Sequence, residues 1–267
     1  MPLRVPLPVP LPVLSRRRGF TLVELLVVIG IIAVLIAILI PTLARAREAS
    51  VRVNCLSNLR ELGTSYRMYA NQYRDRVPLG YWGGQKQANF MIHINENDGF
   101  VSGSYYTLMG LLYQAGLMKS PKALYCPAEP LDRFSFNTPE NPWPPREPLA
   151  AGGQNQNTRC GYGSRPTVNW IENGLWPEYM SVLTRYKHHA ILADLVSNTG
   201  FITRRHRKGV NVYYADGSAR WVDLKALRND LNGVANVIFP FDSAYDANML
   251  NNEGAPRSGV WRRFDEQ

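Results

Sequence analysis

One histidine and one Asp-Gly pair form the sequence pattern with the clearest potential for chemistry. His206 precedes Asp216-Gly217 by nine residues, which gives the pattern H-x9-DG. An imidazole and a carboxylate can form a proton relay or contribute to a cation site. His206 lies, however, in the basic run 204–208, whose positive charges repel a cation. We therefore expect Asp216 to make a turn and His206 to donate a hydrogen bond to the hairpin that contains this turn.

The other candidate ligands form no complete metal-binding or catalytic pattern. His93 and the pair His188-His189 lack the spacing of a zinc site to a second histidine or to a carboxylate. The segments 95–99 and 242–246 are rich in oxygen ligands, as calcium sites are, but neither fits a full loop template. No nucleophile is paired with a base. The sequence therefore predicts no enzyme, no cofactor and no metal.

The composition excludes a disordered or collagen-like chain. Of the 267 residues, 45% are hydrophobic and 19% are charged, which is enough apolar material for one ordinary core. The net charge is +9, but residues 1–19 hold four arginines and no acidic residue, so the rest has 26 basic and 21 acidic residues, or +5. These basic residues form no stripe interleaved with aromatic residues, so we expect no nucleic-acid partner.

The elements that must position these residues begin with an apolar segment. The sixteen residues from Leu25 to Ile40 include no polar side chain. A helix over the 21 residues Phe20–Ile40 is about 31 Å long and can cross a bilayer core of about 30 Å. Four arginines precede it, and the positive-inside rule then predicts a cytoplasmic N-terminus with the C-terminal part outside. We expect a single-pass membrane protein.

Hydrophobicity alone leaves the processing of this segment open. An uncleaved anchor keeps Met1. A secretory signal peptide is cut after small residues, and Ala44-Arg45-Ala46 provides such a site, with Arg47 as the new N-terminus. The apolar run exceeds the roughly 7 to 15 residues of a signal peptide, and Glu24 interrupts its beginning.

The residues around Glu24 favour a third fate, which is processing as a prepilin. The string Arg-Gly-Phe-Thr-Leu-Val-Glu at 18–24, followed by the apolar run, resembles the class III prepilin signal of type IV pilins and type II secretion pseudopilins. The resemblance implies that a prepilin peptidase removes residues 1–19 by cutting between Gly19 and Phe20, and that it methylates the new amino group of Phe20. It also implies that Glu24 neutralises the amino terminus of a neighbouring subunit during filament assembly.

The same resemblance predicts a helix kink at Pro41, which lacks an N–H group and clashes with the preceding turn. Beyond it, apolar and aromatic residues recur every three or four positions from Leu43 to Tyr73, so the helix continues to about residue 74. We expect one helix over residues 20–75. Its first half lies in the membrane and its second half packs on the outer domain.

Residues 76–267 are predicted to form an exported α+β domain with long loops. Residues 128–160 are rich in Pro and Gly and form an irregular insertion. The expected fold is pilin-like, with a long N-terminal helix packed on a small antiparallel β-sheet domain. The patterns predict, in chain order, a helix at 107–115, buried strands at 123–125 and 190–196, a hairpin at 210–222 around Asp216-Gly217, and a helix at 224–229.

Three further features resemble one group of proteins. H-x9-DG, together with Tyr125-Cys126-Pro127 and Cys55-x2-Asn58-Leu59-x2-Leu62-Gly63, is similar to the pseudopilin-like proteins that are abundant in planctomycetes. This resemblance classifies the chain but assigns no mechanism to the motif.

Three cysteines allow at most one disulfide, and an exported domain permits disulfides. A bond between Cys126 and Cys160 would close the base of the Pro-rich insertion, and we favour this pairing. Cys55, on the flank of the helix stripe, could instead pair with either of them.

These observations predict a pseudopilin-like structural subunit in a type II secretion or type IV pilus-like filament. The resemblance implies as partners a prepilin peptidase, other pilin or pseudopilin subunits, membrane lipid, and an inner-membrane assembly platform with its ATPase. It places the anchor in the inner membrane and the outer domain in the periplasm. The alternative is a periplasmic or surface binding protein that uses the helix for delivery. Its carbohydrate or peptide site would be lined by aromatic residues, namely Tyr81, Trp82, Trp143, Trp170 and Trp176.

Overall fold

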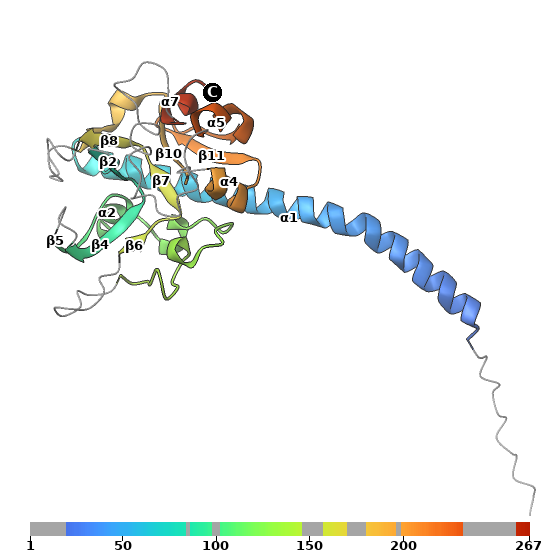
Figure 1. Ribbon diagram of the computed structural model, residues 1–267. Coiled ribbons are helices and arrows are strands. Elements are labelled where there is room, and N and C mark those ends of the chain that lie inside the picture. Colours follow the sequence, from blue (N-terminus) through green and yellow to red (C-terminus); the bar gives the residue numbers. More distant parts are fainter. Residues whose placement is uncertain are drawn as a thin grey trace, which may run out of the picture. The chain divides into compact units, whose positions relative to one another are not determined.

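A computed structural model shows an α+β arrangement in which a long N-terminal apolar helix packs against small antiparallel sheets (Figure 1). The structure describes residues 20–83, 86–97, 102–145, 157–169, 180–195, 199–231 and 260–267. The chain divides into two compact units. Their boundary lies inside the long helix, between Arg47 and Glu48. The expected fold class is confirmed.

The helix α1 spans Leu22–Gln72, and its 51 residues correspond to about 77 Å. The sequence predicts this element well, because the apolar run before Pro41 contains no proline and a single glycine, Gly30. After Gln72 the chain turns through Arg74 and Asp75, which both adopt positive φ angles of 53° and 65°. The N–H of Asp75 donates to the carbonyl of Ala70 (2.8 Å), and the helix ends before Pro78 is reached.

The second half of α1 supplies the centre of the main core. Of the positions that the periodicity predicted as apolar, Leu59, Leu62, Tyr66 and Tyr69 are buried and Leu56 is half-buried, whereas Val53 and Tyr73 stay exposed. The buried positions are Cys55, Leu59, Leu62, Gly63, Ser65, Tyr66, Tyr69 and Ala70. This half of the helix is therefore part of the outer domain.

The described strands form four small sheets. The largest is antiparallel throughout and has the order β12-β11-β10-β7. Its strands are β7 (Tyr162–Ser164), β10 (Ala190–Asp194), β11 (Gly209–Tyr214) and β12 (Ala219–Asp223). The other sheets are β1 (Arg76–Val77) with β9 (Ser181–Val182), β2 (Gly80–Gly83) with β3 (Lys86–Ala88) and β8 (Pro166–Asn169), and β4 (Met91–Asn97) with β5 (Ser102–Tyr106) and β6 (Thr158–Arg159). The pair β2 and β8 is parallel, a departure from the purely antiparallel expectation.

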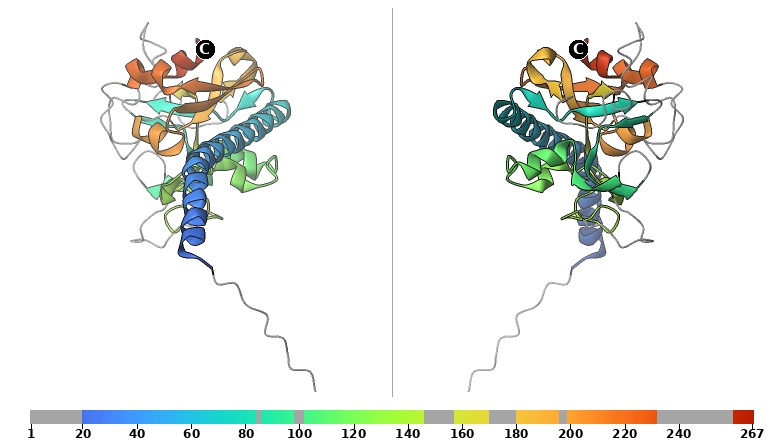
Figure 2. Two further views of the ribbon diagram at one scale, coloured as in Figure 1. Left: turned by 90° about the vertical axis from the view of Figure 1, so that its right-hand side faces the viewer. Right: turned by 90° about the vertical axis from the view of Figure 1, so that its left-hand side faces the viewer.

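The strand β11 is covered on both faces, so all six of its residues are buried. Tyr213 belongs to the core that α1 supplies. Val210, Val212 and Tyr214 point the other way and join a second core with residues of α4 (Thr199–Arg205), α5 (Leu224–Leu231) and α7 (Val260–Asp265). Figures 1 and 2 show α5 and α7, in orange and red, on the side of β10 and β11 away from α1. The hairpin that carries H-x9-DG is thus the middle layer of the domain.

Two short helical elements test the predictions for residues 107–125. The helix α2 (Met109–Gln114) confirms the element predicted at 107–115, and Gly116 follows it with a φ of 69°. The strand predicted at 123–125 is wrong, because Pro121–Leu124 forms the 3-10 helix η1. Pro121 presets the helical φ angle, and the side chain of Ser120 accepts a hydrogen bond from the N–H of Lys122 (3.3 Å).

The later elements follow the sequence more closely. The strand β10, the hairpin β11–β12 and the helix α5 confirm the predictions for 190–196, 210–222 and 224–229. In the predicted insertion, residues 128–145 are irregular apart from the 3-10 helix η2 (Asp132–Phe134), and residues 146–156 lie outside the described part. Phe134 anchors this segment in a third small core with Phe90. The end of the insertion is not irregular, because β6 (Thr158–Arg159) pairs with β4.

Candidate functional site: the assembly helix and the H-x9-DG hairpin

The helix α1 begins with a reciprocal cap between Thr21 and Glu24. The Oε2 atom of Glu24 accepts hydrogen bonds from the N–H and the hydroxyl group of Thr21 (2.8 and 2.7 Å). In return, the N–H of Glu24 donates to the Thr21 hydroxyl (3.2 Å). Threonine followed three residues later by glutamate is the usual pattern of such a capping box. Glu24 therefore has a role in its own chain that the prediction of an intersubunit role did not include.

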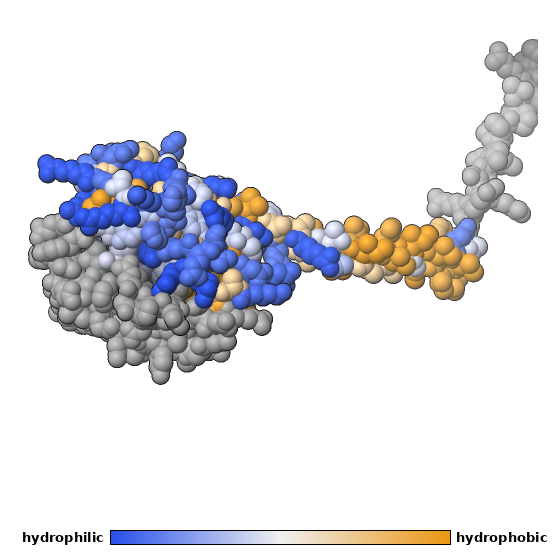
Figure 3. Space-filling model, turned by 90° about the horizontal axis from the view of Figure 1, so that it is seen from above, coloured by the Kyte–Doolittle hydropathy of each residue, from blue (hydrophilic) through white to orange (hydrophobic). Residues whose placement is uncertain are grey.

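The first half of α1 exposes its apolar side chains on all sides. All side chains from residue 20 to residue 47 are exposed, and Phe20 has 71% of its surface accessible. Figure 3 shows this segment as a continuous apolar surface. By length and composition, α1 is the one helix of the described residues that is able to cross a membrane. An apolar cylinder of this kind requires lipid or other helices around it.

The proline predicted to kink the helix lies inside α1, which continues on both sides of it. Pro41 has no N–H group for the carbonyl of Ala37. At the next residue, the Thr42 hydroxyl donates to the carbonyl of Ile38 (3.1 Å). This side-chain hydrogen bond lies in the same turn of the helix as Pro41. The kink itself stays a prediction. Gly19, on the leader side of the predicted cleavage, lies outside the described residues.

The two ends of H-x9-DG occupy different environments. His206 lies just after α4 and is buried, with 2% of its surface exposed. Asp216 and Gly217 form the exposed turn between β11 and β12. His206 contacts the hairpin through the Trp221 ring, 5.9 Å between centroids, but its Nε2 atom faces Asp194 and Cys126 instead of the turn. The predicted hydrogen bond from His206 to the hairpin is therefore not the one observed.

Asp216 makes the turn, as predicted. Its Oδ1 atom accepts from the N–H of Ser218 (2.8 Å), and its Oδ2 atom lies 3.1 Å from Nδ1 of His188. Partial burial raises the pKa of Asp216, but the hydrogen bonds from Ser218 and His188 outweigh this effect and lower the pKa to about 2. The ionised carboxylate thus stabilises the turn.

This pKa predicts a pH dependence of stability. The folded-state pKa of about 2 lies below the unfolded value of roughly 3.9, so the contribution of Asp216 is complete above about pH 4. It is lost as the pH falls from about 4 towards 2. We expect Asp216→Asn to lower the free energy of unfolding at pH 6 and to have a smaller effect at pH near 2.5, measured by urea unfolding. A difference that grows on acidification would contradict this role.

The Asp-Gly turn also docks on the long helix. The Nη2 atom of Arg67 in α1 donates to the carbonyl of Ala215 (2.9 Å). Gly217 has a φ of 95°, and a Cβ atom added there would lie 2.6 Å from the same Nη2 atom. Glycine is needed at this position both for the backbone conformation and for the approach of Arg67.

We therefore expect Gly217→Ala to destabilise the domain by about 1–3 kcal/mol through backbone strain, and somewhat more through loss of the Arg67 hydrogen bond. Gly116→Ala is the matched control, because Gly116 also has a positive φ of 69° but has open space around it. Thermal unfolding of both variants, alone and with Arg67→Ala, separates strain from contact. Equal losses in the two variants, unchanged by Arg67→Ala, would show that the contact contributes nothing.

The strand β11, which lies between the two ends of the motif, runs alongside α1. The Nδ2 atom of Asn211 donates to the carbonyl of Arg52 (3.4 Å), and the Tyr213 ring packs where Gly63 has no side chain. A Cβ atom on Gly63 would lie 2.0 Å from that ring. The nine residues between His206 and Asp216 therefore run along the helix, from the level of Arg52 to the level of Arg67.

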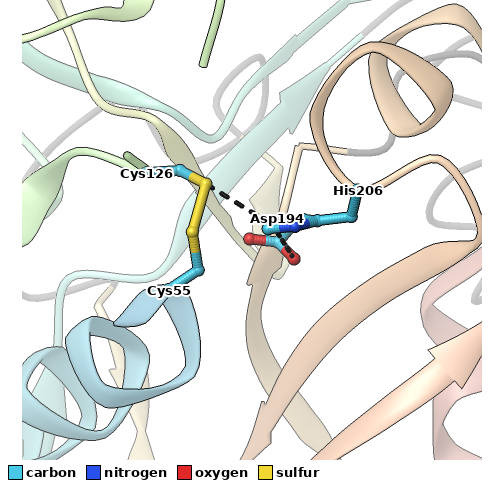
Figure 4. Close-up of side chains that lie close together, drawn as sticks. All are labelled: Cys55, Cys126, Asp194 and His206. Atoms are coloured by element: carbon cyan, nitrogen blue, oxygen red, sulfur yellow. Dashed lines mark hydrogen bonds and ion pairs between the residues drawn. A yellow bond between two sulfur atoms is a disulfide. The ribbon is translucent and has the colours of Figure 1, made fainter. Parts of the chain in front are cut away.

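A disulfide joins Cys55 in α1 to Cys126, and this corrects the favoured pairing of Cys126 with Cys160 (Figure 4). The pairing with Cys55 was the open alternative. Cys160 is a buried free thiol whose Sγ atom donates to the carbonyl of Leu124 (2.8 Å). Burial raises the pKa of this thiol, so it is kept protonated and unreactive.

Asp194 and His206 lie directly beside this disulfide. The Nε2 atom of His206 is 3.3 Å from Oδ2 of Asp194 and 3.4 Å from Sγ of Cys126. The N–H of Asn211 holds the same carboxylate oxygen at 2.6 Å. One ligand atom from each of Cys55, Cys126, Asp194 and His206 lies within 4.8 Å of the others, and all four residues are buried. They are the residues of the described part that could together hold a metal ion.

This cluster was missed by sequence reasoning. Asp194 ends a buried strand and has no local partner, and the four residues come from α1, the segment after η1, β10 and the end of α4. No short motif connects them. The only available signal was that Cys55, Cys126 and His206 all belong to segments with the same family resemblance.

The aromatic residues of the predicted binding site are only partly described. Trp143 packs against Tyr113 (4.8 Å between centroids) and Phe136 (6.3 Å), at the edge of the main core. The backbone of Tyr81 and Trp82 forms part of β2, while Trp170 and Trp176 lie outside the described residues, as do 98–99 and 242–246 of the oxygen-rich segments. Trp143 therefore acts as a packing residue.

The comparison with protein families agrees with the geometry of the N-terminal segment. Residues 14–40 match the model of the prokaryotic N-terminal methylation motif. This match includes the predicted cleavage position, Glu24 and the apolar run. Neither the curated proteins nor the solved structures contain a match to the chain. The motif implies processing by a prepilin peptidase, inner-membrane anchoring before assembly, and assembly with pilin-like subunits.

Proposed function

We propose that the chain is a non-enzymatic, pseudopilin-like subunit of a type II secretion or type IV pilus-like filament. A prepilin peptidase cuts between Gly19 and Phe20 and methylates Phe20. The outer domain lies on the periplasmic side, because the arginines of the leader keep the N-terminus in the cytoplasm. An inner-membrane assembly platform and its ATPase then move the subunit from the bilayer into the filament.

The observation that carries this proposal is the apolar surface, exposed on all sides, that follows the Thr21–Glu24 cap. Sixteen residues without a polar side chain cannot face water, and a helix that leaves the bilayer must bury them against identical helices. The methylation motif over residues 14–40 supports the same assembly. The outer domain holds its own half of α1 through the disulfide and the H-x9-DG hairpin, which suits a subunit that transmits force along its helix.

Glu24 can serve both its own chain and a neighbour. Its Oε2 atom accepts both hydrogen bonds from Thr21, so the second oxygen of the same carboxylate is available to pair with a methylated amino terminus. A charge near the beginning of a membrane helix is expensive without such a partner. The capping role and the assembly role are therefore compatible.

The mass of the mature N-terminus tests the proposal directly. We expect protein recovered from membranes that contain a prepilin peptidase to begin with N-methyl-Phe20, and Gly19→Ala to leave the leader attached. Peptide mass spectrometry distinguishes the outcomes. A chain that begins at Arg47 would show removal of a signal peptide, and an intact Met1 in the presence of active peptidase would show a simple anchor, and both results overturn the proposal.

A further inference from the structure

Asp194 and His206 are buried directly beside the disulfide. A disulfide is uncharged and needs neither a carboxylate nor an imidazole next to it. Burial of a carboxylate costs several kcal/mol unless it is paired. Asp194 is 1% exposed, and within the described residues its Oδ1 atom has no hydrogen-bond partner. A buried polar atom without a partner needs a physical explanation, and a bound ion is one such explanation.

Two distances between donor atoms, both from His206, match the edges of a tetrahedral zinc site. Zinc lies about 2.0–2.2 Å from nitrogen and oxygen ligands and about 2.3 Å from thiolate sulfur. The edges of such a tetrahedron are about 3.3 Å between nitrogen and oxygen and about 3.5 Å between nitrogen and sulfur. The observed distances from Nε2 of His206 are 3.3 Å to Asp194 and 3.4 Å to Cys126.

We propose that, when Cys55 and Cys126 are reduced, their thiolates bind Zn²⁺ together with Asp194 and His206. Binding releases the two thiol protons and involves no electron transfer, so it needs no oxidant or reductant. Oxidation of the two thiolates to the disulfide passes two electrons to a thiol oxidant and removes two of the four ligands. A dithiol or phosphine reductant supplies the two electrons for the reverse step. The disulfide joins α1 only to the segment after η1, whereas zinc would also bind β10 and the residue after α4.

The charges around the cluster allow a cation. Arg204, Arg207 and Lys208 are exposed, and the buried Arg205 forms an ion pair with Glu129. Two thiolates and one carboxylate bring three negative charges to a divalent ion, which leaves the site with one excess negative charge. Arg52 lies over the Trp221 ring, 3.9 Å from its centroid, and this ring contacts His206, so a positive charge is close to the site. The basic run that argued against a metal therefore points mostly to solvent.

The test uses the full chain in detergent, purified with a phosphine reductant, exposed to zinc and then desalted. Inductively coupled plasma mass spectrometry measures the zinc content. We expect about one zinc per chain, and none after oxidation with diamide. Substitution with Co²⁺ is expected to produce the thiolate charge-transfer absorption of a tetrahedral site. Cys160→Ser, which removes the one cysteine outside the cluster, is the matched control and is expected to keep the metal.

Removal of a ligand distinguishes this site from loose thiol binding. We expect Asp194→Asn and His206→Gln to lower the zinc affinity at least 100-fold, since even loss of an outer hydrogen-bond partner costs about 10–100-fold. Circular dichroism confirms that each variant is folded. If a variant does not fold, the Co²⁺ spectrum of the wild-type chain decides whether the thiolates bind the metal. Less than about a tenth of a zinc per reduced, folded chain, or a Co²⁺ spectrum without thiolate absorption, would overturn the proposal.

Discussion

Replacement of Glu24 by glutamine is expected to exclude the chain from filaments while the outer domain folds normally. Glutamine at this position can still accept hydrogen bonds from Thr21, so the capping box is preserved. The substitution removes the negative charge that would pair with the amino terminus of a neighbouring subunit. Loss of one partner of a buried charge pair costs about 2–5 kcal/mol, so incorporation should fall at least 30-fold.

A matched variant separates this charge from the cap. Thr21→Ala removes the cap and keeps the carboxylate, and we expect it to assemble nearly as the wild type does, with a helix destabilised by about 1 kcal/mol. Filament content is measured by immunoblotting of sheared filaments, and leader removal by mass spectrometry of the same cells. If Glu24→Gln assembles normally after leader removal, the helix serves only for delivery, as in the alternative of a membrane-delivered binding protein.

The second large effect is expected from the disulfide between α1 and the outer domain. The bond closes a loop with a sequence separation of 71 residues. A loop of this length corresponds to about 4 kcal/mol of stabilisation from restriction of the unfolded chain. We expect Cys55→Ala and Cys126→Ala each to lower the free energy of unfolding by about this amount in metal-free, oxidising buffer.

The double variant and Cys160 provide the controls. Cys55→Ala/Cys126→Ala should be no less stable than either single variant, apart from the small packing loss, because the bond is lost only once. Cys160→Ala removes a buried thiol that makes no disulfide and should cost about 1 kcal/mol. Urea unfolding of the four variants gives these values. Strictly additive losses for Cys55 and Cys126, or a mapped Cys126–Cys160 bond, would contradict the structure.

Local patterns were enough to predict the long helix, the hairpin and two of the short helices, α2 and α5. The apolar run and the period of three to four residues predicted α1, which ends at Gln72 within three residues of the expected end. Alternation around Asp216-Gly217 predicted β11 and β12. These features depend on residues that are near one another in the chain, so the information is present in a short window.

The errors have a common physical cause. The apolar segment 123–125 has the composition of a strand, but Ser120 and Pro121 start a 3-10 helix instead, because a cap and a preset φ angle outweigh a three-residue preference. Cys160 was predicted as the partner of Cys126 because a bond between them would close the base of the Pro-rich insertion. Disulfide pairing depends on distance in space, which sequence separation does not determine.

By itself the sequence determined the N-terminal segment of this protein: a methylation motif, a charge at Glu24 and an apolar helix that requires lipid or other helices. Each of these properties belongs to consecutive residues and to their interaction with the surrounding solvent or bilayer. Only the tertiary structure decided the role of H-x9-DG and the place of the cysteines. His206, Asp194 and the two cysteines meet because β11 lies along α1 and buries them together, and such a meeting results from the packing of distant segments.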